Sequence, residues 1–525
     1  MKLLLTGIFA VISIVSFAQL TPPNIQWQKS LGGSGSDYAR SIEQTTDSGY
    51  IIAGSSSSHD GDVTTNHGHD DYWVVKLKKN GAIQWQKTLG GKKYDQAASI
   101  QQTMDGGYIV AGPSYSNNGD VTGLHGGSDT TFPDYWIVKL RKNGDVQWQR
   151  CLGGSHIDFA TSIQQTADSG YIVAGWSTSN DGDVTGNQGA EDWWIVKLDK
   201  KGFIEWGKSI GGTKTDIANC IRQTTDGGYI VAGFSFSNDG DVKGNHGDVD
   251  YWIVKLKRNG IVEWQECLGG SGFDEATSIR QTSDSGYIVA GQSYSNDGDV
   301  TGNQGGDYWI VKLDKKGFIQ WQKSIGSPGI DEATSVQQTL DGGYIIAGSS
   351  GGNSNVVHRN HGATDYWIVK LAKNSNIQWE KYLGGSYRDE SYSIQQTADS
   401  GYIVAGESFS NDDDVTGNHG SNDYWIVKLS KDGPPLVPVE TNAFAENISK
   451  NIYNEFSVYP NPAKNVLYIQ TKSNTSFFLL NASGKIVFTK TINGSGSVDI
   501  KNLPAGNYYL KNTTTGVVRK VIINK

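Results

Sequence analysis

The sequence is poor in the residues that mark several common classes of protein. Its 525 residues include only three cysteines, too few and odd in number for a disulfide framework: Cys151, Cys220 and Cys267. We predict that they are small buried apolar residues. Helical periodicity is missing from the body of the chain, which favours an all-β protein. After residue 17 no apolar run approaches the length of a membrane-spanning helix, so no transmembrane span is expected.

Motifs that carry catalysis are also missing. The sequence has no nucleophile elbow, no HExxH motif, no Cys/His metal spacing and no glycine loop that cradles phosphate. A glycosidase needs a particular pair of carboxylates, but every repeat described below carries Asp at the same places and no pair stands out. No catalytic residue is predicted, and no cofactor except calcium at one kind of loop.

Basic residues are scarce in most of the chain. Residues 19–455 carry 35 Lys and Arg against 53 Asp and Glu, a net charge of −18. This negative charge argues against nucleic-acid binding and is compatible with divalent cations or basic partners. Residues 456–525 differ, with nine basic residues and one acid, Asp499, so the composition changes near residue 456.

The first 18 residues are typical of a signal peptide. Lys2 supplies the positive charge, residues 3–17 form the apolar run, and Ser-Phe-Ala before Gln19 is a small-residue cleavage site. We expect a secreted mature chain that starts at about Gln19.

Repetition is what the sequence has in abundance. A Trp preceded by Gln or Glu recurs at intervals of 57, 58 or 63 residues, at Trp27, Trp85, Trp148, Trp206, Trp264, Trp321 and Trp379. The phrase YWIVKL, or a near copy, recurs in step with it. Of the 16 Trp residues, 14 occupy these two slots, and we predict that they pack between repeats. The spacing indicates seven units of about 58 residues.

Each unit contains four short β-branched and aromatic stretches, which in the second unit are 96–103, 107–112, 134–140 and 146–152. Tight-turn sequences such as MDGG and RKNG join them. This pattern predicts an all-β fold in which residues 19–433 form a seven-bladed β-propeller of four-stranded blades; a linear β-solenoid is the alternative. The array opens on a lone fourth strand (25–31) and closes on a lone third strand (423–429). We therefore predict that the N-terminal strand completes the last blade and hides two sheet edges.

The run LGGSGSDYARSIEQTTDSGYIIAG (31–54), followed by DYWVVKL, resembles the bacterial beta-propeller repeat family labelled SBBP. The resemblance covers about 25–433 and recurs in every unit. It implies the propeller fold and an extracytoplasmic setting, and it implies no catalytic residues.

The end of the chain differs from the repeats in composition and residue pattern. Residues 434–455 form a Pro-containing linker, and alternating apolar residues from 456 predict a small Ig-like β-sandwich. Residues 456–525 resemble the C-terminal sorting domain of the Bacteroidetes type IX (Por) secretion system. The matching residues are Tyr459, Pro460, Asn461, Pro462, Ser483, Gly484, Lys485, Leu503, Pro504, Ala505, Gly506 and Tyr508. The resemblance implies the type IX secretion machinery as a partner, and a protein that is secreted or held at the outer-membrane surface.

Propeller connectivity puts the long loops of all blades on one face, where a ligand would bind. Aromatic residues at the start of these loops vary between copies and could stack on sugars or pack against neighbouring loops. They are Trp176, Tyr115, Phe236, Tyr294 and Phe409.

One long loop has the spacing of a calcium site. Asp181, Asp183, Asn187 and Asp192 stand at positions 1, 3, 7 and 12, with Gly186 at position 6. The Asp-x-Asp pair recurs in other copies, however, the twelfth position holds Asp where a calcium loop has Glu, and the flanks are strands. Asx-type turns explain the same residues, so calcium and a turn both stay open.

Two further slots recur in every unit. Each link between units holds an Asp, which we predict caps backbone N–H groups: Asp37, Asp95, Asp158, Asp216, Asp274, Asp331 and Asp389. A ring of seven carboxylates that holds a cation near the channel mouth is the alternative. A loop slot holds His in five copies, but Gln188 and Gln304 in the other two. Because Gln is a poor metal ligand, this argues against a His–metal or catalytic role.

Taken together, these features favour a secreted or cell-surface propeller that acts as a binding or adhesion module for a glycan or a protein. An extracellular enzyme acting on polysaccharide and a ligand-free structural spacer are the alternatives. Only the sixth long loop (351–362) departs clearly from its siblings, by losing its acids, and this departure is consistent with drift.

Overall fold

The computed structural model describes residues 20–126, 132–351, 360–434, 456–471, 474–481, 485–513 and 517–524. The predicted signal peptide (1–18), most of the predicted linker (434–455), Ser483 and Gly484 lie outside these residues. The chain separates into two compact units that divide between residues 436 and 437. Within the described residues, no helix has the length and apolar character needed to cross a membrane.

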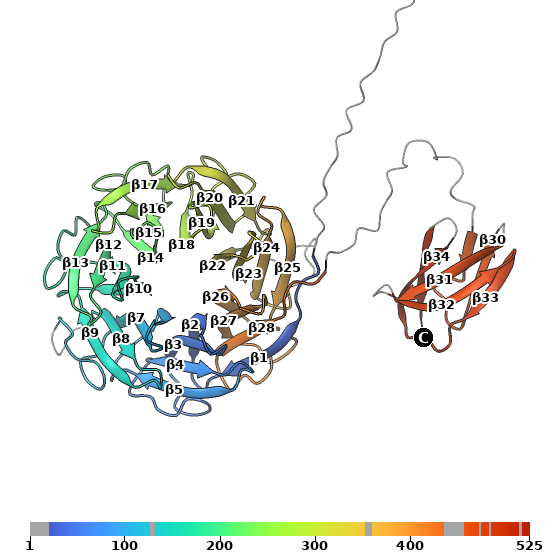
Figure 1. Cartoon of the computed structure of the whole chain (residues 1–525), viewed down its shortest axis with the longest axis horizontal. Coiled ribbons are helices and arrows are strands. Elements are labelled where there is room, and N and C mark those ends of the chain that lie inside the picture. Colours follow the sequence, from blue (N-terminus) through green and yellow to red (C-terminus); the bar gives the residue numbers. More distant parts are fainter. Residues whose placement is uncertain are drawn as a thin grey trace, which may run out of the picture. The chain divides into compact units, whose positions relative to one another are not determined.

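The first unit consists of seven four-stranded sheets that stand in a ring (Figure 1). The innermost strands are β2 (Asp37–Gln44), β6 (Ser99–Gln102), β10 (Asp158–Gln165), β14 (Asp216–Gln223), β18 (Asp274–Gln281), β22 (Asp331–Gln338) and β26 (Asp389–Gln396). The second strands are β3 (Tyr50–Ser56), β7 (Tyr108–Ser114), β11 (Tyr171–Ser177), β15 (Tyr229–Ser235), β19 (Tyr287–Ser293), β23 (Tyr344–Ser350) and β27 (Tyr402–Ser408).

The third strands, which carry the YWIVKL phrase, are buried from end to end. They are β4 (Asp71–Leu77), β8 (Asp134–Leu140), β12 (Asp192–Leu198), β16 (Asp250–Leu256), β20 (Asp307–Leu313), β24 (Asp365–Leu371) and β28 (Asp423–Leu429). The outer strands are β5 (Ile83–Leu89), β9 (Val146–Leu152), β13 (Ile204–Ile210), β17 (Val262–Leu268), β21 (Ile319–Ile325), β25 (Ile377–Leu383) and β1 (Ile25–Leu31).

The ring closes as the sequence predicts, because the N-terminal strand β1 pairs with β28 and completes the last blade. The two ends of the ring also bind each other directly. The Gly433 N–H donates to the Thr21 carbonyl at 2.9 Å, and the Ser430 N–H donates to the Asn24 carbonyl at 2.8 Å. The solenoid alternative is therefore wrong for this chain: its first and last strands share one sheet.

Aromatic pairs join every blade to the next. In the third strands a Tyr, or Trp193 in blade three, lies 4.3–4.6 Å from the Trp of the following blade. Nearer the outside, each outer-strand Trp meets a second-strand Tyr of the next blade edge-on at 5.6–5.9 Å. The prediction that 14 Trp residues pack between repeats is confirmed. Burying one Trp contributes about 4–6 kcal/mol as an upper bound.

The free edges of the innermost strands are covered by side chains of neighbouring blades. The last residue of each innermost strand is Gln, whose Oε1 accepts the N–H of a turn residue in the preceding blade at 2.8–2.9 Å in all seven blades. The bond from Ala398 to Gln44 carries this pattern across the closure between last and first blades. These bonds join the first turn of each blade to the innermost strand of the next.

A buried ion pair repeats inside each blade. The Lys of YWIVKL is 0–3% exposed and lies 2.8–3.3 Å from the Asp of the turn between the first two strands. In blade one this is Lys76 with Asp47. Because the lysine is buried, its charge needs this partner.

The second unit is a small β-sandwich with its own core. One sheet contains β29 (Phe456–Tyr459), β30 (Val466–Thr471) and β33 (Ser495–Asp499); the other contains β32 (Ile486–Ile492), β31 (Thr475–Asn481), β34 (Gly506–Asn512) and β35 (Val518–Ile523). Asn461 of the Tyr-Pro-Asn-Pro motif joins the ends of the unit, since its Oδ1 accepts the Ile522 N–H at 2.7 Å and its Nδ2 donates to the Lys520 carbonyl at 2.8 Å.

Candidate functional site

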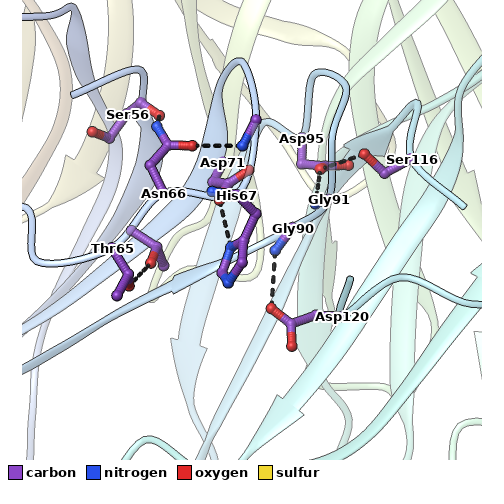
Figure 2. Close-up of polar contacts among 12 residues, drawn as sticks. Ser56, Thr65, Asn66, His67, Asp71, Gly90, Gly91, Asp95, Ser116 and Asp120 are labelled. Atoms are coloured by element: carbon purple, nitrogen blue, oxygen red, sulfur yellow. Dashed lines mark hydrogen bonds and ion pairs between the residues drawn. The ribbon is translucent and has the colours of Figure 1, made fainter. Parts of the chain in front are cut away.

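The seven blade junctions on the long-loop side are occupied by carboxylates with structural roles. In the junction shown in Figure 2, Asp95 Oδ2 accepts the Gly91 N–H at 2.7 Å and the Ser116 hydroxyl at 2.8 Å, while Asp120 accepts the Gly90 N–H at 3.2 Å. The equivalent Asp of every link accepts an N–H four residues earlier, at 2.7–2.9 Å. The predicted capping role of these seven residues is confirmed.

Each junction also brings two carboxylates close together around one glycine. A Cβ on Gly90 would lie only 2.5 Å from Asp71 Oδ1 and 2.7 Å from Asp95 Oδ2, so the position requires glycine. Both aspartates are fully buried. Burial, with Asp71 adding to it, raises the pKa of Asp95 to about 6.

The His slot belongs to the same junctions. Nδ1 of each of the five histidines lies 2.6–2.9 Å from the first Asp of a third strand, as His67 does from Asp71 (Figure 2). Gln188 keeps the accompanying backbone bond to Asp192, and its side chain donates to Asp241 of the next blade at 2.8 Å. Gln188 thus keeps the backbone bond to the third-strand Asp, while its side chain binds the next blade instead of that Asp.

The four residues with calcium-loop spacing are bound by backbone groups. Asp181 accepts the Ser155 N–H at 2.7 Å, Asp183 accepts the Gly153 N–H at 3.3 Å, and Asp192 accepts the Gln188 N–H at 2.7 Å. Asn187 donates to the Ser177 carbonyl at 2.8 Å. In the part of the chain that the structure describes, no three or more His, Cys, Asp or Glu side chains are grouped to hold a metal ion.

The five predicted ligand-binding aromatics lie one to a blade around the long-loop face. Trp176 is half-buried and stacks on Phe159, with centroids 5.4 Å apart and planes 8° apart. Tyr294 is 42% exposed. Tyr115, Phe236 and Phe409 are half-buried. They surround the central channel without meeting in one place.

Inside this circle of aromatics, the mouth of the central channel forms a cavity of about 560 Å³. All seven blades line it, six of them through their innermost strands and blade two through residues just before β6; among the lining residues are Tyr38, Arg40, Gln96, Phe159, Asn219, Glu275, Thr277, Thr334 and Tyr392. Because the innermost strands converge here, side chains from distant repeats face one space. This cavity is the candidate site.

Two slots at the start of the innermost strands, which supply much of the lining of the mouth, do not follow the sevenfold repeat. The residue after the link Asp is, from blade one to seven, Tyr38, Gln96, Phe159, Ile217, Glu275, Glu332 and Glu390. Two residues later stand Arg40, Ala98, Thr161, Asn219, Thr277, Thr334 and Tyr392. Carboxylates therefore gather in blades five to seven, and aromatic rings occur in blades one, three and seven.

A polar network fixes the side chains of blade seven. Arg388 binds both carboxylate oxygens of Glu390 at 2.6 Å, and the Tyr392 hydroxyl lies 2.7 Å from Glu407 and 2.9 Å from Glu390. The Arg40 guanidinium lies over the Tyr392 ring, 4.1 Å from its centroid. These contacts hold the ring and both charges in place before any ligand arrives.

The acids of blades five and six have different surroundings. Glu275 accepts bonds from Asn219 and Gln292, both at 3.1 Å. Burial, together with the negative charges of Glu275 and Glu390, raises the pKa of Glu332 to about 7. Sequence reasoning missed this cluster because it compared the long loops. Comparing the innermost strands position by position would have revealed it.

Comparisons with known proteins identify the C-terminal unit. Residues 457–524 match the family model described as a secretion system C-terminal sorting domain. An uncharacterized WD repeat-containing protein of Acanthamoeba polyphaga mimivirus is 22% identical over 209 residues, which are 32% of this chain; the chain spans only 15% of that relative.

Solved structures with similar folds include BamB from Moraxella catarrhalis, with 15% identity and a TM-score of 0.35 over 77% of this chain and 88% of that one. Sqt1 from Chaetomium thermophilum has 9% identity and a TM-score of 0.37, over 77% of this chain and 100% of that one. Neither likeness assigns an activity. The sorting domain does identify how the protein is exported. The chain is a β-propeller protein exported by type IX secretion and is secreted or held at the cell surface.

Proposed function

We propose that the propeller binds an extracellular carbohydrate at the mouth of its channel. The observation that carries this proposal is the lining of one cavity by the Tyr38, Phe159 and Tyr392 rings together with charged and amide groups. A sugar presents C–H groups on its faces and hydroxyl groups at its edge. Aromatic rings bind the first, and carboxylate, guanidinium and amide groups bind the second.

The size and charge of the cavity agree with such a ligand. A volume of about 560 Å³ is in the range of small-molecule sites. Since Glu275 lines the mouth and the charges of Glu332 and Glu390 lie near it in the next two blades, a neutral or amino sugar fits the mouth better than a polyanion. Trp176 would support the Phe159 ring, and Tyr115, Phe236, Tyr294 and Phe409 would contact outer residues of a longer chain.

A glycan array probed with the full secreted chain tests the proposal. We expect Phe159→Ala to weaken binding of any captured glycan about tenfold, because a stacking face is lost. Phe318→Ala is the matched control, since that ring is 60% exposed on a hairpin outside the mouth. An array without a specific ligand, together with specific capture of one protein, would replace the carbohydrate by a protein partner.

A second candidate, an enzyme acting on polysaccharide, is favoured by one observation. A carboxyl group whose pKa is raised to about 7 can act as a general acid, and Glu332 has charged neighbours of the same sign. Release of reducing ends from a polysaccharide, abolished by Glu332→Gln, would favour this enzyme over a binding module. Binding without turnover would favour the module.

We further infer that the repeats are of the SBBP type and that residues 1–18 direct the chain across the inner membrane before type IX export. The repeated LGG link, Tyr-x-x-x-Gly strand and Asp-x-x-x-x-Lys-Leu strand support the first inference. The charge and apolar run of the leader support the second. A mature N-terminus at Gln19 would establish cleavage.

A further inference from the structure

The short-turn end of the channel, below the mouth, contains a break in the hydrogen bonding between blades. Along the free edge of each innermost strand, alternate N–H groups point away from the sheet and need an acceptor. In five junctions the acceptor is the side chain of the seventh residue of one blade's innermost strand, and the donor is the backbone N–H of the eighth residue in the next blade's innermost strand. Gln395, for example, accepts the Gln44 N–H at 2.6 Å. The other four such bonds measure 2.7–2.8 Å.

Blades four and five have arginine in this slot. Arg222 and Arg280 stand where the other blades have Gln101, Gln164, Gln337, Gln395 or Glu43. A guanidinium has no acceptor atom, so it cannot take the N–H of the next blade. The N–H groups of Gln281 and Gln338 therefore lack the partner that their five counterparts have, and at this slot two neighbouring junctions present donors without an acceptor.

A second substitution adds to the break between blades four and five. The fifth residue of the innermost strand is Ser in six blades, and its hydroxyl accepts the N–H of the following blade at 3.3 Å. Blade four has Cys220 instead, whose thiol donates to the Ile279 carbonyl at 3.7 Å. The Ile279 N–H thus becomes a third donor without its usual acceptor.

The two arginines have donor capacity to spare. Arg222 Nη1 bonds Ser162 and the Ile221 carbonyl, at 3.0 and 2.6 Å, and Arg280 Nη1 bonds the Ile279 carbonyl at 3.3 Å and approaches Cys220 Sγ at 3.7 Å. Among the described residues, Nε and Nη2 of both arginines donate to no protein group. Both side chains line a channel cavity of about 330 Å³, which leaves room for a small ligand.

The channel does not hold enough negative charge to balance them. Glu43 of blade one also lines this cavity, but it already accepts the Gln102 N–H at 2.7 Å and forms no ion pair within the described residues. Burial opposes ionisation of the Cys220 thiol, yet Arg222 and Arg280 outweigh it and hold the pKa of Cys220 below its usual value. The local field is therefore positive inside an acidic protein.

From this arrangement we propose that the channel binds one oxyanion group, a carboxylate, sulfate or phosphate, between Arg222 and Arg280. The two guanidinium groups would supply charge-assisted bonds, and the unpaired Gln281 and Gln338 N–H groups would complete the set of donors. The oxyanion comes either as a free inorganic ion or as the acidic group of a sugar.

Titration calorimetry of the full secreted chain with sulfate, phosphate and glucuronate, at constant ionic strength and with glucose as the neutral control, tests the proposal. Binding of the inorganic ions would show that a free oxyanion suffices, and binding of glucuronate alone would identify an acidic sugar. Both outcomes support the site. Heat from none of the three, or equal heat from glucose and glucuronate, would overturn it.

Variants that restore the repeat provide the second readout. The double variant Arg222→Gln, Arg280→Gln gives both slots the residue that four other blades carry, so it should fold with its melting temperature preserved. We expect oxyanion affinity to fall at least about tenfold. Arg258→Gln, which removes an equal charge from a side chain 73% exposed to solvent, should change nothing. Undiminished binding by the double variant would contradict the proposal.

Glu43→Gln changes the same site in the opposite direction. Glutamine keeps an acceptor for the Gln102 N–H and removes the negative charge that shares the channel with the oxyanion. Affinity should rise several-fold. A fall in affinity would mean that the anion does not sit between the arginines and Glu43.

Discussion

The junctions between blades and the lining of the central channel are built from the same seven repeats but follow opposite rules. The aromatic slots between blades and the lysine and aspartate slots within each blade recur almost without change, and every copy makes the same contact. In the channel, a single slot holds Tyr, Gln, Phe, Ile or Glu depending on the blade. Positions that close the ring tolerate little variation, while positions that face the channel are free to acquire a ligand.

Removing a strand from the ring should have the largest effect on folding. Deleting residues 24–33 takes away β1, so β28 loses its partner and the last blade keeps three strands. We expect unfolding or aggregation, because two sheet edges become exposed. Circular dichroism and size-exclusion chromatography provide the measurement.

The matched control truncates the chain after residue 434. Since the C-terminal sandwich has a separate core, the propeller should keep its melting transition. A stable, monomeric 24–33 deletion variant would show that closure by β1 is dispensable.

Single aromatic substitutions compare the two regions directly. Trp309→Ala empties a fully buried slot between blades and should cost about 3–5 kcal/mol of unfolding free energy. Phe159→Ala at the half-buried mouth should cost under about 2 kcal/mol. Denaturant titration of both variants measures the difference, and equal losses would remove the distinction between junction and mouth.

Acidification should strengthen the junctions. Burial raises the pKa of Asp95, Asp158, Asp307, Asp389 and Asp423 to about 6. Since aspartate in the unfolded chain titrates near 3.8, the folded state binds more protons between pH 4 and 6, and stability falls as the pH rises through this window. We expect a melting temperature several degrees higher at pH 5 than at pH 8.

Below about pH 4 the trend should reverse. Burial opposes ionisation of Asp47, but hydrogen bonds from Thr45 and Gly49 and the Lys76 charge outweigh it and lower the pKa of Asp47 to about 2. Protonating such turn aspartates releases the buried lysines, so stability is lost as the pH falls through that range. A melting temperature that rises steadily from pH 5 to pH 8 would contradict the raised pKa of the junction carboxylates.

Removal of metal should have the smallest effect. Asp181, Asp183 and Asp192 already accept backbone N–H groups, which is how an Asx-type turn uses them. We expect the melting midpoint to be the same with and without a chelator. A drop with the chelator that calcium reverses would establish the calcium loop after all.

The repeated region could be predicted from the sequence because each slot occurs seven times. The β-strand order, the closing role of residues 25–31 and the packing of 14 Trp residues all follow from patterns that repetition makes visible. The link aspartates were also predicted correctly as caps, because Asp before a strand has a known local role.

The mouth could not be predicted in the same way. Glu275, Glu332 and Glu390 stand about 58 residues apart, and the packing of blades five, six and seven brings their charges close enough to interact. The long loops indicated Trp176 instead, which stacks on Phe159 but does not itself line the cavity. The site at Arg222 and Arg280 could not be predicted for a related reason, because it depends on hydrogen bonds between blades that the sequence does not show.

The most direct test replaces residues at the mouth that differ between blades by residues that other blades carry. Replacing Tyr38 and Phe159 by Gln, as at Gln96, and Arg40 and Tyr392 by Thr, as at Thr161, gives each slot a residue that another blade already carries. We expect a folded propeller that keeps one cooperative melting transition and no longer binds the glycan captured by the natural chain. Undiminished glycan binding by this variant would contradict the claim that the positions departing from the repeat carry the function.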